Sequence, residues 1–285
     1  MQLIEKLVGL VGISLKTMGI TVISPLFWLT LWFTYRFYLQ YEWDKASAGY
    51  LALASSLEGL CAGFFAIYLT AVFGLSIQPG IELYLMGPCS MLFSVLCPRF
   101  LCLSYGAGVI LVLCTLCHVS VDSVGICALV GILHLVEGML VLFAGGRHTV
   151  AIYGNRRGKI TEKSGIYRFW PVPVGLLVAL QGEEGNWMNM PQWWPLLETK
   201  AEMAYKALGL IPLAVSLGYS DMSGIKGDVK RRRIYNGGLI IGYAIILLGI
   251  CITVAELSKG EWIAIFWMVL GHEVIIYSAD LFTKN

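Results

Sequence analysis

The sequence predicts an all-α protein, a polytopic transmembrane helical bundle of about eight or nine membrane segments, since each crossing helix needs ~20 apolar residues. Three observations predict this class. Hydrophobic residues make up 58% of the 285 residues and charged residues only 13%, whereas soluble domains carry roughly 25% charged residues. The mean hydropathy is +0.75. Finally, the charged residues gather in short stretches between long apolar runs.

Residues 1–19 predict an amphipathic helix that lies in the membrane interface. Leu3, Leu7 and Leu10 recur at helical spacing beside Glu5 and Lys6, a pattern typical of helices with one apolar and one charged face. We expect this helix to lead directly into the first membrane span.

Residues 20–144 form the predicted N-terminal transmembrane region. Apolar runs of sufficient length predict helical spans at 20–40, 48–76, 100–118 and 121–144. The segment 81–97 contains Pro88 and is followed by Pro98, so it either crosses the membrane or enters it and returns. Backbone groups freed by proline cannot face lipid, so this segment is expected to pack inside the bundle or near an interface.

Two basic segments orient the rest of the chain. Eleven of the twenty Lys and Arg residues fall in 147–168 and 226–233. By the positive-inside rule, the basic loops 145–168 and 218–234 are both cytoplasmic, so an even number of crossings separates them. Residues 147–160 alternate apolar and polar side chains with interrupting glycines, which favours a hairpin-like or extended surface loop.

Residues 169–285 form the predicted C-terminal transmembrane region. Helical spans are expected at 199–217, 235–257 and 261–282, and a short segment with two prolines, 169–180, crosses or re-enters. The segments 169–180 and 199–217 supply the two crossings between the basic loops, which leaves Trp187, Trp193 and Trp194 in an outer aromatic belt. The C-terminus is then cytoplasmic. If 81–97 crosses, five crossings precede Arg147 and the N-terminus lies outside. If 81–97 is re-entrant, four crossings precede Arg147 and the N-terminus lies inside.

The basic residues are candidate contacts for anionic lipids or partner proteins, although membrane orientation alone also explains them. A net charge of +2 gives no reason to expect nucleic-acid binding. The candidate contact residues are Arg147, Arg156, Arg157, Lys159, Lys230, Arg231, Arg232 and Arg233.

Most of the eight cysteines lie within apolar runs, where cysteine behaves as a small hydrophobic residue. The exception is the CxxCH spacing of Cys114, Cys117 and His118, which is the pattern that attaches c-type haem. A lone match in a cysteine-rich chain is a weak signal, and we expect no cofactor.

Ionisable residues inside apolar runs are costly and often mark functional sites. His134 and Glu137 share one helix face, and His272 and Glu273 lie in the last span. These four residues could supply metal ligands and a base to a membrane hydrolase, or carry protons in a transporter. The alternative is a hydrogen-bonded cluster that fixes helix packing. Other residues of this kind are Glu58, Glu256 and Asp280.

Glycines provide small surfaces on which helices approach closely, within one chain or between copies in an oligomer. These surfaces are expected at Gly59 with Gly63, at Gly125 with Gly131 and Gly138, and at Gly238 with Gly242.

Several ordered motifs resemble the membrane region of MinJ-like PDZ proteins of Gram-positive bacteria. The motifs are Ser24–Trp28, Pro98–Tyr105, His134–Leu140, Gly158–Lys159, Arg168–Pro173, Trp193–Pro195, Gly218–Asp221 and Gly271–Glu273. The resemblance implies a multi-span region that acts as a membrane scaffold at the division site, followed by a cytoplasmic PDZ domain. We expect no PDZ domain in this sequence, because Asn285 directly follows the last predicted span.

The function expected from the sequence is therefore a non-catalytic scaffold or adaptor in the cytoplasmic membrane that recruits membrane or cytoplasmic proteins, in cell division or envelope assembly. The alternative is an intramembrane metal-dependent hydrolase or proton-linked transporter that uses His134, Glu137, His272 and Glu273. A spatial observation separates the two, because only the alternative needs these side chains within hydrogen-bonding or metal-binding reach of one another.

Overall fold

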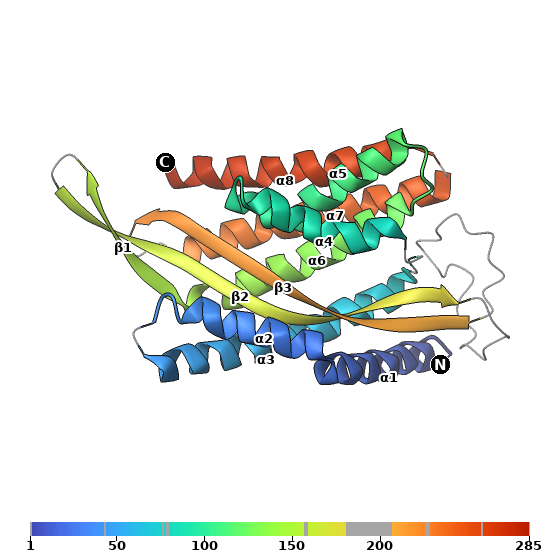
Figure 1. The fold of residues 1–285 in the computed structure, drawn as a ribbon, viewed down its shortest axis with the longest axis horizontal. Helices are drawn as coiled ribbons and strands as arrows, with labels where there is room; N and C mark the ends of the chain where they lie inside the picture. The colour runs from blue at the N-terminus through green and yellow to red at the C-terminus, as the bar shows by residue number, and fades with distance from the viewer. Residues whose placement is uncertain are drawn as a thin grey trace.

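The computed structural model contains a helical bundle crossed by a three-stranded antiparallel sheet in the order β1-β2-β3 (Figure 1). It describes residues 2–284 apart from 43, 76, 78–79, 157–158, 181–206, 226–228 and 258. The helices are α1 (Gln2–Ile23), α2 (Pro25–Tyr38), α3 (Lys45–Phe73), α4 (Ile81–Ser94), α5 (Leu103–Leu116), α6 (Ser123–Ala144), α7 (Val229–Leu257) and α8 (Glu261–Lys284), with short 3-10 helices η1 (Pro98–Leu101) and η2 (Gly145–Arg147). The strands are β1 (Thr149–Arg156), β2 (Lys159–Leu180) and β3 (Ala207–Ile225).

The described helices that could cross a membrane are fewer than the sequence predicted. Four of them, α3, α6 continued through η2, α7 and α8, are long and apolar enough, and the count rises to five if the pair α1–α2, bent by 68°, forms one span. The expected about eight or nine segments of ~20 apolar residues are therefore not supported. Long apolar helices remain the main component of the fold, and they are compatible with a multi-pass membrane protein.

Two predicted helical segments are strands, which corrects the all-α prediction. Residues 169–180 belong to β2, and 207–217 belong to β3, with which β2 pairs from Lys163 to Leu180. The remainder of the predicted span 199–217 and the predicted aromatic belt lie outside the described residues. Every residue from Trp170 to Leu176 is buried, and a strand buried on both faces has a continuous apolar sequence like that of a helix. The hairpin predicted around 147–160 is confirmed, because β1 pairs antiparallel with β2.

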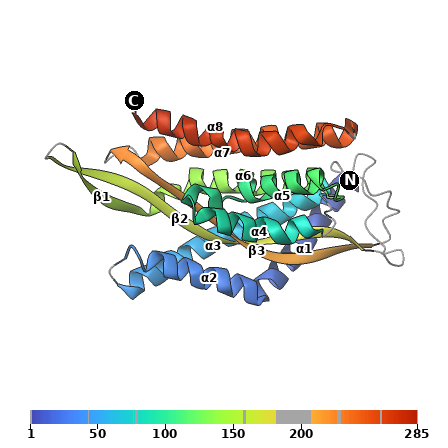
Figure 2. The same ribbon diagram turned by 45° about the horizontal axis from the view of Figure 1, so that its top comes forward.

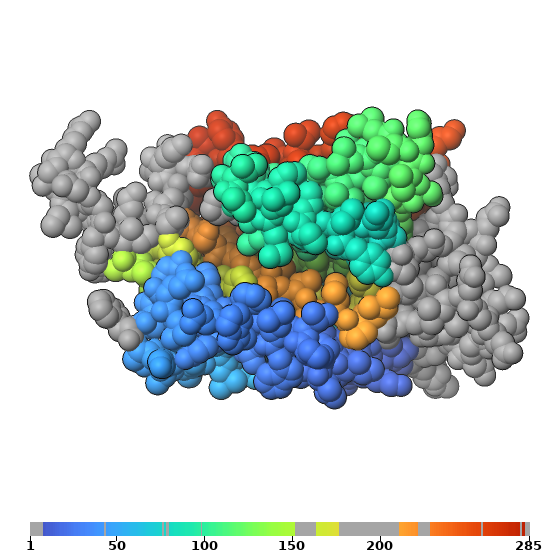
Figure 3. All heavy atoms as spheres, viewed as in Figure 1, coloured from blue at the N-terminus to red at the C-terminus, as the bar shows by residue number. Residues whose placement is uncertain are grey.

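The strands β2 and β3 lie between two groups of helices. Figure 1 shows α1 and α2 on one side of this hairpin and α4 to α8 on the other, with α3 crossing it, and in Figure 2 α7 and α8 lie on the side opposite α2. Trp170, Val172 and Val174 of β2 belong to the same apolar core as residues of α6 and α7. In the space-filling view, β3 remains visible between the N-terminal helices and α4 (Figure 3). The core of the protein is therefore built around β2.

β1 pairs with β2 only as far as Ile166. Beyond that residue, the edge of β2 opposite β3 has no pairing strand among the described residues and packs against glycines of α3. A Cβ atom at Gly59 would collide with the carbonyl group of Pro171, and one at Gly63 would collide with Pro173. Proline lacks the N–H donor, so it is suited to a strand edge that has no pairing strand. Pro171 and Pro173, which suggested a broken helix, thus lie on a strand edge that α3 covers. Gly59 and Gly63 allow close approach of a strand, whereas the sequence predicted close approach of a helix.

The crossing of α6 and α7 also depends on glycines. A Cβ at Gly138 would lie 2.7 Å from Ile241 Cγ1, and a Cβ at Gly237 would lie 3.0 Å from the Gly138 carbonyl oxygen. Gly238 and Gly242 have open space around their Cα atoms, so the predicted close surface on α7 is displaced by one residue to Gly237. This contact brings α6, which carries His134 and Glu137, firmly against α7.

The helices α4 and α5 form a pair that doubles back. Each has 14 residues, or about 21 Å, which is short of the ~30 Å hydrocarbon core. A Cβ at Gly106 of α5 would meet Ser90 and the Met86 carbonyl of α4, so the two helices are in close contact. The segment 81–97, expected either to cross or to re-enter, and the predicted span 100–118 are therefore the two arms of one helical hairpin, whose turn is η1.

The basic segments lie together at one end of the molecule, where the C-terminal end of α8 also lies (Figure 1). Arg233 donates to the carbonyl oxygens of Leu142 and Phe143 at the end of α6, at 3.0 and 3.1 Å. Arg231 stacks on Phe282 of α8. The start of α1 lies at the opposite end of the molecule. Since α5 runs back along α4, the chain traverses the molecule an odd number of times between the start of α1 and η2.

Candidate metal centre

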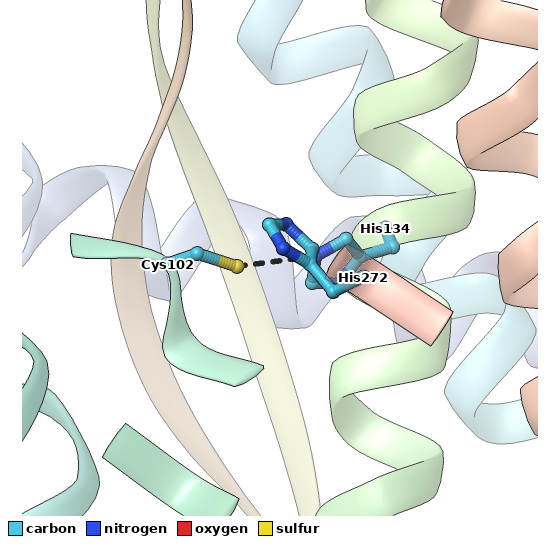
Figure 4. A group of neighbouring side chains, drawn as sticks. All are labelled: Cys102, His134 and His272. Atoms are coloured by element: carbon cyan, nitrogen blue, oxygen red, sulfur yellow. Dashed lines mark hydrogen bonds between the residues drawn. The ribbon is translucent and has the colours of Figure 1, made fainter. Parts of the chain in front are cut away.

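Three potential metal ligands from distant parts of the sequence meet inside the bundle. Cys102 lies at the junction of η1 and α5, His134 in the middle of α6, and His272 in the middle of α8. One ligand atom of each lies within 4.8 Å of the other two. In Figure 4 the thiol of Cys102 points toward the two imidazole rings. We name these three residues the Cys–His–His cluster.

The spacing of the cluster fits a small metal ion. The Cys102 Sγ and His134 Nε2 atoms are 3.2 Å apart, whereas two ligands with bonds of ~2.3 Å to sulfur and ~2.05 Å to nitrogen would be about 3.6 Å apart at a tetrahedral angle. A shift of a few tenths of an ångström would therefore accommodate an ion. The rings of His134 and His272 have centroids 5.4 Å apart and are nearly perpendicular, at 82°.

The hydrogen bond on the far side of the His134 ring determines its tautomer. Its Nδ1 lies 2.8 Å from the carbonyl oxygen of Val130, one turn earlier in α6. A carbonyl oxygen only accepts, so Nδ1 carries the proton and donates it. In the neutral ring, Nε2 then presents its lone pair toward Cys102, which is the arrangement found in metal-binding histidines.

The His272 ring is held by the α4–α5 hairpin. Its Nδ1 lies 3.1 Å from the phenolic oxygen of Tyr105, and Tyr105 donates to Glu273 Oε1 at 2.6 Å. Arg99, in η1, approaches the second Glu273 oxygen at 3.5 Å. The hairpin therefore supplies the thiol of Cys102 as a potential ligand, and its Tyr105 holds the ring of His272.

Glu137 lies beside the cluster rather than within it. Its Oε2 is 3.9 Å from His134 Nε2, and its side chain is 18% exposed. The tight group of ligand atoms comprises Cys102, His134 and His272 alone. Glu137 is too far from His134 for a hydrogen bond, and its carboxylate would border an ion held by the cluster.

Aromatic rings enclose the cluster. The Tyr243 ring of α7 meets His134 edge-on at a centroid distance of 5.2 Å, and its hydroxyl donates to the Met268 carbonyl of α8 at 2.6 Å. A Cβ on Gly271 would lie 2.9 Å from the Tyr243 ring. The glycine before His272 thus allows α8 to approach α7 closely at this depth.

The structure brings together all four residues of the predicted constellation. His134 and His272 belong to the cluster, Glu137 borders it, and Glu273 contacts Tyr105 next to it. Among the other ionisable residues considered, Glu256 is exposed, and the side chain of Asp280 lies outside the described residues.

Glu58 belongs to a separate network that joins α3 to β2. It accepts hydrogen bonds from Arg147 and Trp170, both at 2.6 Å, and from Arg168. The Arg168 side chain is 1% exposed. The arrangement is an ion pair with additional donors, which explains Glu58 as a packing residue.

The residues of the haem-attachment motif lie apart from the cluster. Cys114 is in the last turn of α5, Cys117 follows it, and both Cys117 and His118 are exposed. His118 adopts a positive φ of 55° in the turn that ends the helix. Within the described part of the chain, the group of ligand atoms close enough to hold a metal is the Cys–His–His cluster and not this motif.

The candidate lipid or partner contacts have different environments. Lys230, Arg231 and Arg147 are exposed, whereas Arg232 is 2% exposed and lies 3.2 Å from Asp221. Arg232 is buried and Arg233 binds carbonyl oxygens at the end of α6, so Arg147, Lys230 and Arg231 are the described members of this group that face outward. Arg157 and the side chains of Arg156 and Lys159 lie outside the described residues.

Sequence reasoning missed Cys102 and Tyr105. Cys102 was grouped with the apolar cysteines, but it directly follows the 3-10 turn that begins at Pro98 and precedes the first turn of α5. A cysteine at a helix break between apolar runs, followed by Ser104 and Tyr105, was the signal that could have separated it from the others. Irregular backbone at membrane depth is tolerated where it packs inside protein or lines a cavity.

The fold and the cluster together define a helical protein, compatible with a multi-pass membrane protein, that has potential metal ligands in its interior. No protein-family model, no curated protein and no solved structure matches the chain. The functional argument therefore depends on the geometry of the cluster itself.

Proposed function

We propose that the protein is an integral membrane protein that binds one transition-metal ion, with zinc the best fit, through Cys102, His134 and His272. The observation that carries the proposal is the convergence of three ligand atoms within 4.8 Å from η1–α5, α6 and α8. A thiol with two imidazoles is a donor set for zinc or copper, whereas magnesium and calcium prefer oxygen ligands.

The experiment is a metal analysis of the purified full chain in detergent. We expect about one zinc ion per chain after zinc loading and removal of excess metal, and a thiolate-to-metal charge-transfer band when cobalt replaces zinc. Cys102→Ser and His272→Gln should lose most of the bound metal. The matched controls are Cys117→Ser and His118→Gln, because both residues are exposed and lie outside the cluster.

Metal binding by the wild type that is unchanged in Cys102→Ser and His272→Gln would contradict this assignment, as would a wild type that binds no zinc. Gel filtration of each variant would establish that the chain is folded. Loss of bound metal then reports on the ligands and not on aggregation.

A second candidate function is metal-dependent hydrolysis within the membrane, which the position of Glu137 favours. With three protein ligands, a tetrahedral ion keeps one position for water, and a carboxylate near that position can act as its general base. Glu137→Gln should retain zinc and lose hydrolysis. Mass spectrometry would compare lipids and peptides in membranes that contain the wild type or Glu137→Gln, and identical profiles would refute the hydrolytic function.

The scaffold function, the MinJ-like resemblance, the cytoplasmic membrane location and the cytoplasmic C-terminus remain predictions. Support for the orientation comes from the exposed Arg147, Lys230 and Arg231, of which Arg231 stacks on Phe282 near the end of α8, because positive residues accumulate on the cytoplasmic side. Crosslinking and pull-down from native membranes test the scaffold function. A stable protein partner is expected, and recovery of the chain alone would contradict it.

A further inference from the structure

The Tyr105 hydroxyl lies between the ring of His272 and the carboxylate of Glu273. The phenolic oxygen is 3.1 Å from His272 Nδ1 and 2.6 Å from Glu273 Oε1. Tyr105 comes from the first turn of α5, whereas His272 and Glu273 are neighbours in α8. One hydroxyl group therefore connects the α4–α5 hairpin to the metal-binding segment of α8.

The proton of this hydroxyl can serve only one of its neighbours. A carboxylate accepts hydrogen bonds, and Tyr105 donates to Glu273 Oε1, while the Arg99 guanidinium lies 3.5 Å from the other carboxylate oxygen. The phenolic oxygen then has only lone pairs to offer His272. It accepts the Nδ1 proton, which leaves Nε2 as the ligand nitrogen of the neutral ring.

The second histidine of the cluster is anchored in the same sense. His134 Nδ1 donates to the Val130 carbonyl, so both imidazoles have their Nδ1 atoms committed and their Nε2 atoms available. The two anchors differ in origin. His134 is anchored by the backbone of its own helix, but His272 is anchored by a side chain from another part of the chain.

We infer that Tyr105 and Glu273 are positioning residues for the metal site, which select the Nε2 tautomer of His272 and orient its ring toward Cys102. This inference depends on the proposed metal binding. It adds that part of the metal affinity comes from Tyr105 and Glu273, which hold the His272 ring in place. Outer partners of metal-ligating histidines typically contribute 10- to 100-fold to metal affinity. Because Cys102 and Tyr105 are three residues apart on the same hairpin, the ligand and the anchor reach the site together.

The packing of Tyr105 permits a conservative test. Its side chain is buried, at 7% exposure, and its ring meets Phe100 and His272 edge-on at centroid distances of 5.0 and 5.1 Å. Tyr105→Phe retains these ring contacts and removes only the oxygen. For Glu273, Gln keeps an acceptor oxygen for Tyr105, whereas Leu keeps a similar volume without one.

The experiment measures zinc affinity by competition with a chelator dye and records the ligand-field spectrum of the cobalt-loaded protein. We expect Tyr105→Phe and Glu273→Leu to bind zinc about 10- to 100-fold more weakly and to alter the cobalt bands. Glu273→Gln should restore most of the affinity lost in Glu273→Leu. The matched control is Tyr38→Phe, which removes a buried hydroxyl bonded to Ser55 away from the cluster and should leave the affinity within about threefold.

The outcomes separate this inference from the proposed function. A wild type that binds no zinc overturns both. A wild type that binds zinc, with Tyr105→Phe within about threefold of its affinity and with an unchanged cobalt spectrum, overturns the positioning role alone. If Tyr105→Phe does not fold, the comparison of Glu273→Gln with Glu273→Leu decides, since equal affinities for those two variants also overturn it.

Discussion

Removal of the Glu58 carboxylate is expected to destabilise the protein severely, because Glu58 joins α3 to β2 through a buried charge. The Arg168 side chain is 1% exposed and the Glu58 side chain 10% exposed, so Glu58→Ala would leave a guanidinium buried without its counter-ion. Breaking a buried pair in this way costs about 3–5 kcal/mol. The hydrogen bond from Trp170 is lost in the same variant.

Arg147 supplies the internal comparison. It donates to the same carboxylate at 2.6 Å, but its side chain is 64% exposed, and exposed ion pairs contribute at most about 1 kcal/mol. We therefore expect Arg147→Ala to lower the free energy of unfolding by a fraction of the loss in Glu58→Ala. The double variant Glu58→Met with Arg168→Met should recover stability relative to Glu58→Ala, because paired removal leaves no unmatched charge.

The assay is the free energy of unfolding of the full chain in bicelles, measured by steric trapping. It compares Glu58→Ala with Arg147→Ala, and it compares Glu58→Met and Arg168→Met with their double variant. A coupling energy of about 2 kcal/mol or more is expected for the pair. Additive losses, or equal losses in Glu58→Ala and Arg147→Ala, would refute the view that burial of the Arg168–Glu58 pair dominates this network.

Two further predictions concern α3. Gly63→Ala should lower the yield of folded protein strongly, because its Cβ would overlap Pro173. Gly49→Ala, in the same helix, has open space around the new Cβ and should be neutral or stabilising by up to about 1 kcal/mol. Gel filtration of both variants tests this, and similar yields would argue against a tight contact between strand and helix. Asp44 caps α3, and hydrogen bonds from the hydroxyl and the amide of Ser47 hold the pKa of its carboxyl below the ordinary value. Because the folded-state pKa is depressed, the stabilisation is present above the unfolded value of about 3.9 and is lost as the pH falls below it. The difference in melting temperature between wild type and Asp44→Ala should therefore shrink in acid, and a difference that is constant with pH would contradict this effect.

Helices with uniform apolar runs could be predicted from the sequence, but the identity of β2 and β3 as strands could not. The segments now seen as α3, α6 and α8 were expected within three residues of their observed bounds, and α7 begins six residues earlier than expected. In β2, the run from Trp170 to Leu176 offers no alternation of apolar and polar residues, because helices and the neighbouring strand cover it. Only the pair Pro171 and Pro173 argued against a helix, and a short kinked span explained the same pair equally well.

The candidate site was predictable where ionisable residues stood out from an apolar background. His134, Glu137, His272 and Glu273 were recognisable for that reason, and the structure places them close together, which the sequence left open. Cys102 and Tyr105 did not stand out, because cysteine and tyrosine are ordinary components of apolar segments. Their role depends on the turn at η1, which brings the hairpin back against α8, and the pairing of segments so far apart is a property of the tertiary structure.

The burial of β2 within a helical bundle, from Trp170 to Leu176, constrains how the chain can enter a membrane. A helix satisfies its own backbone groups and can be inserted alone, but a single strand exposes unpaired N–H and C=O groups that hydrocarbon cannot satisfy. β2 is completed 26 residues before β3 begins, at Leu180 and Ala207 respectively. β2 therefore cannot partition into lipid as it is synthesised and must wait for β3. Joint entry of the two paired strands then comes before the packing of α7 and α8, which follow β3 in the chain.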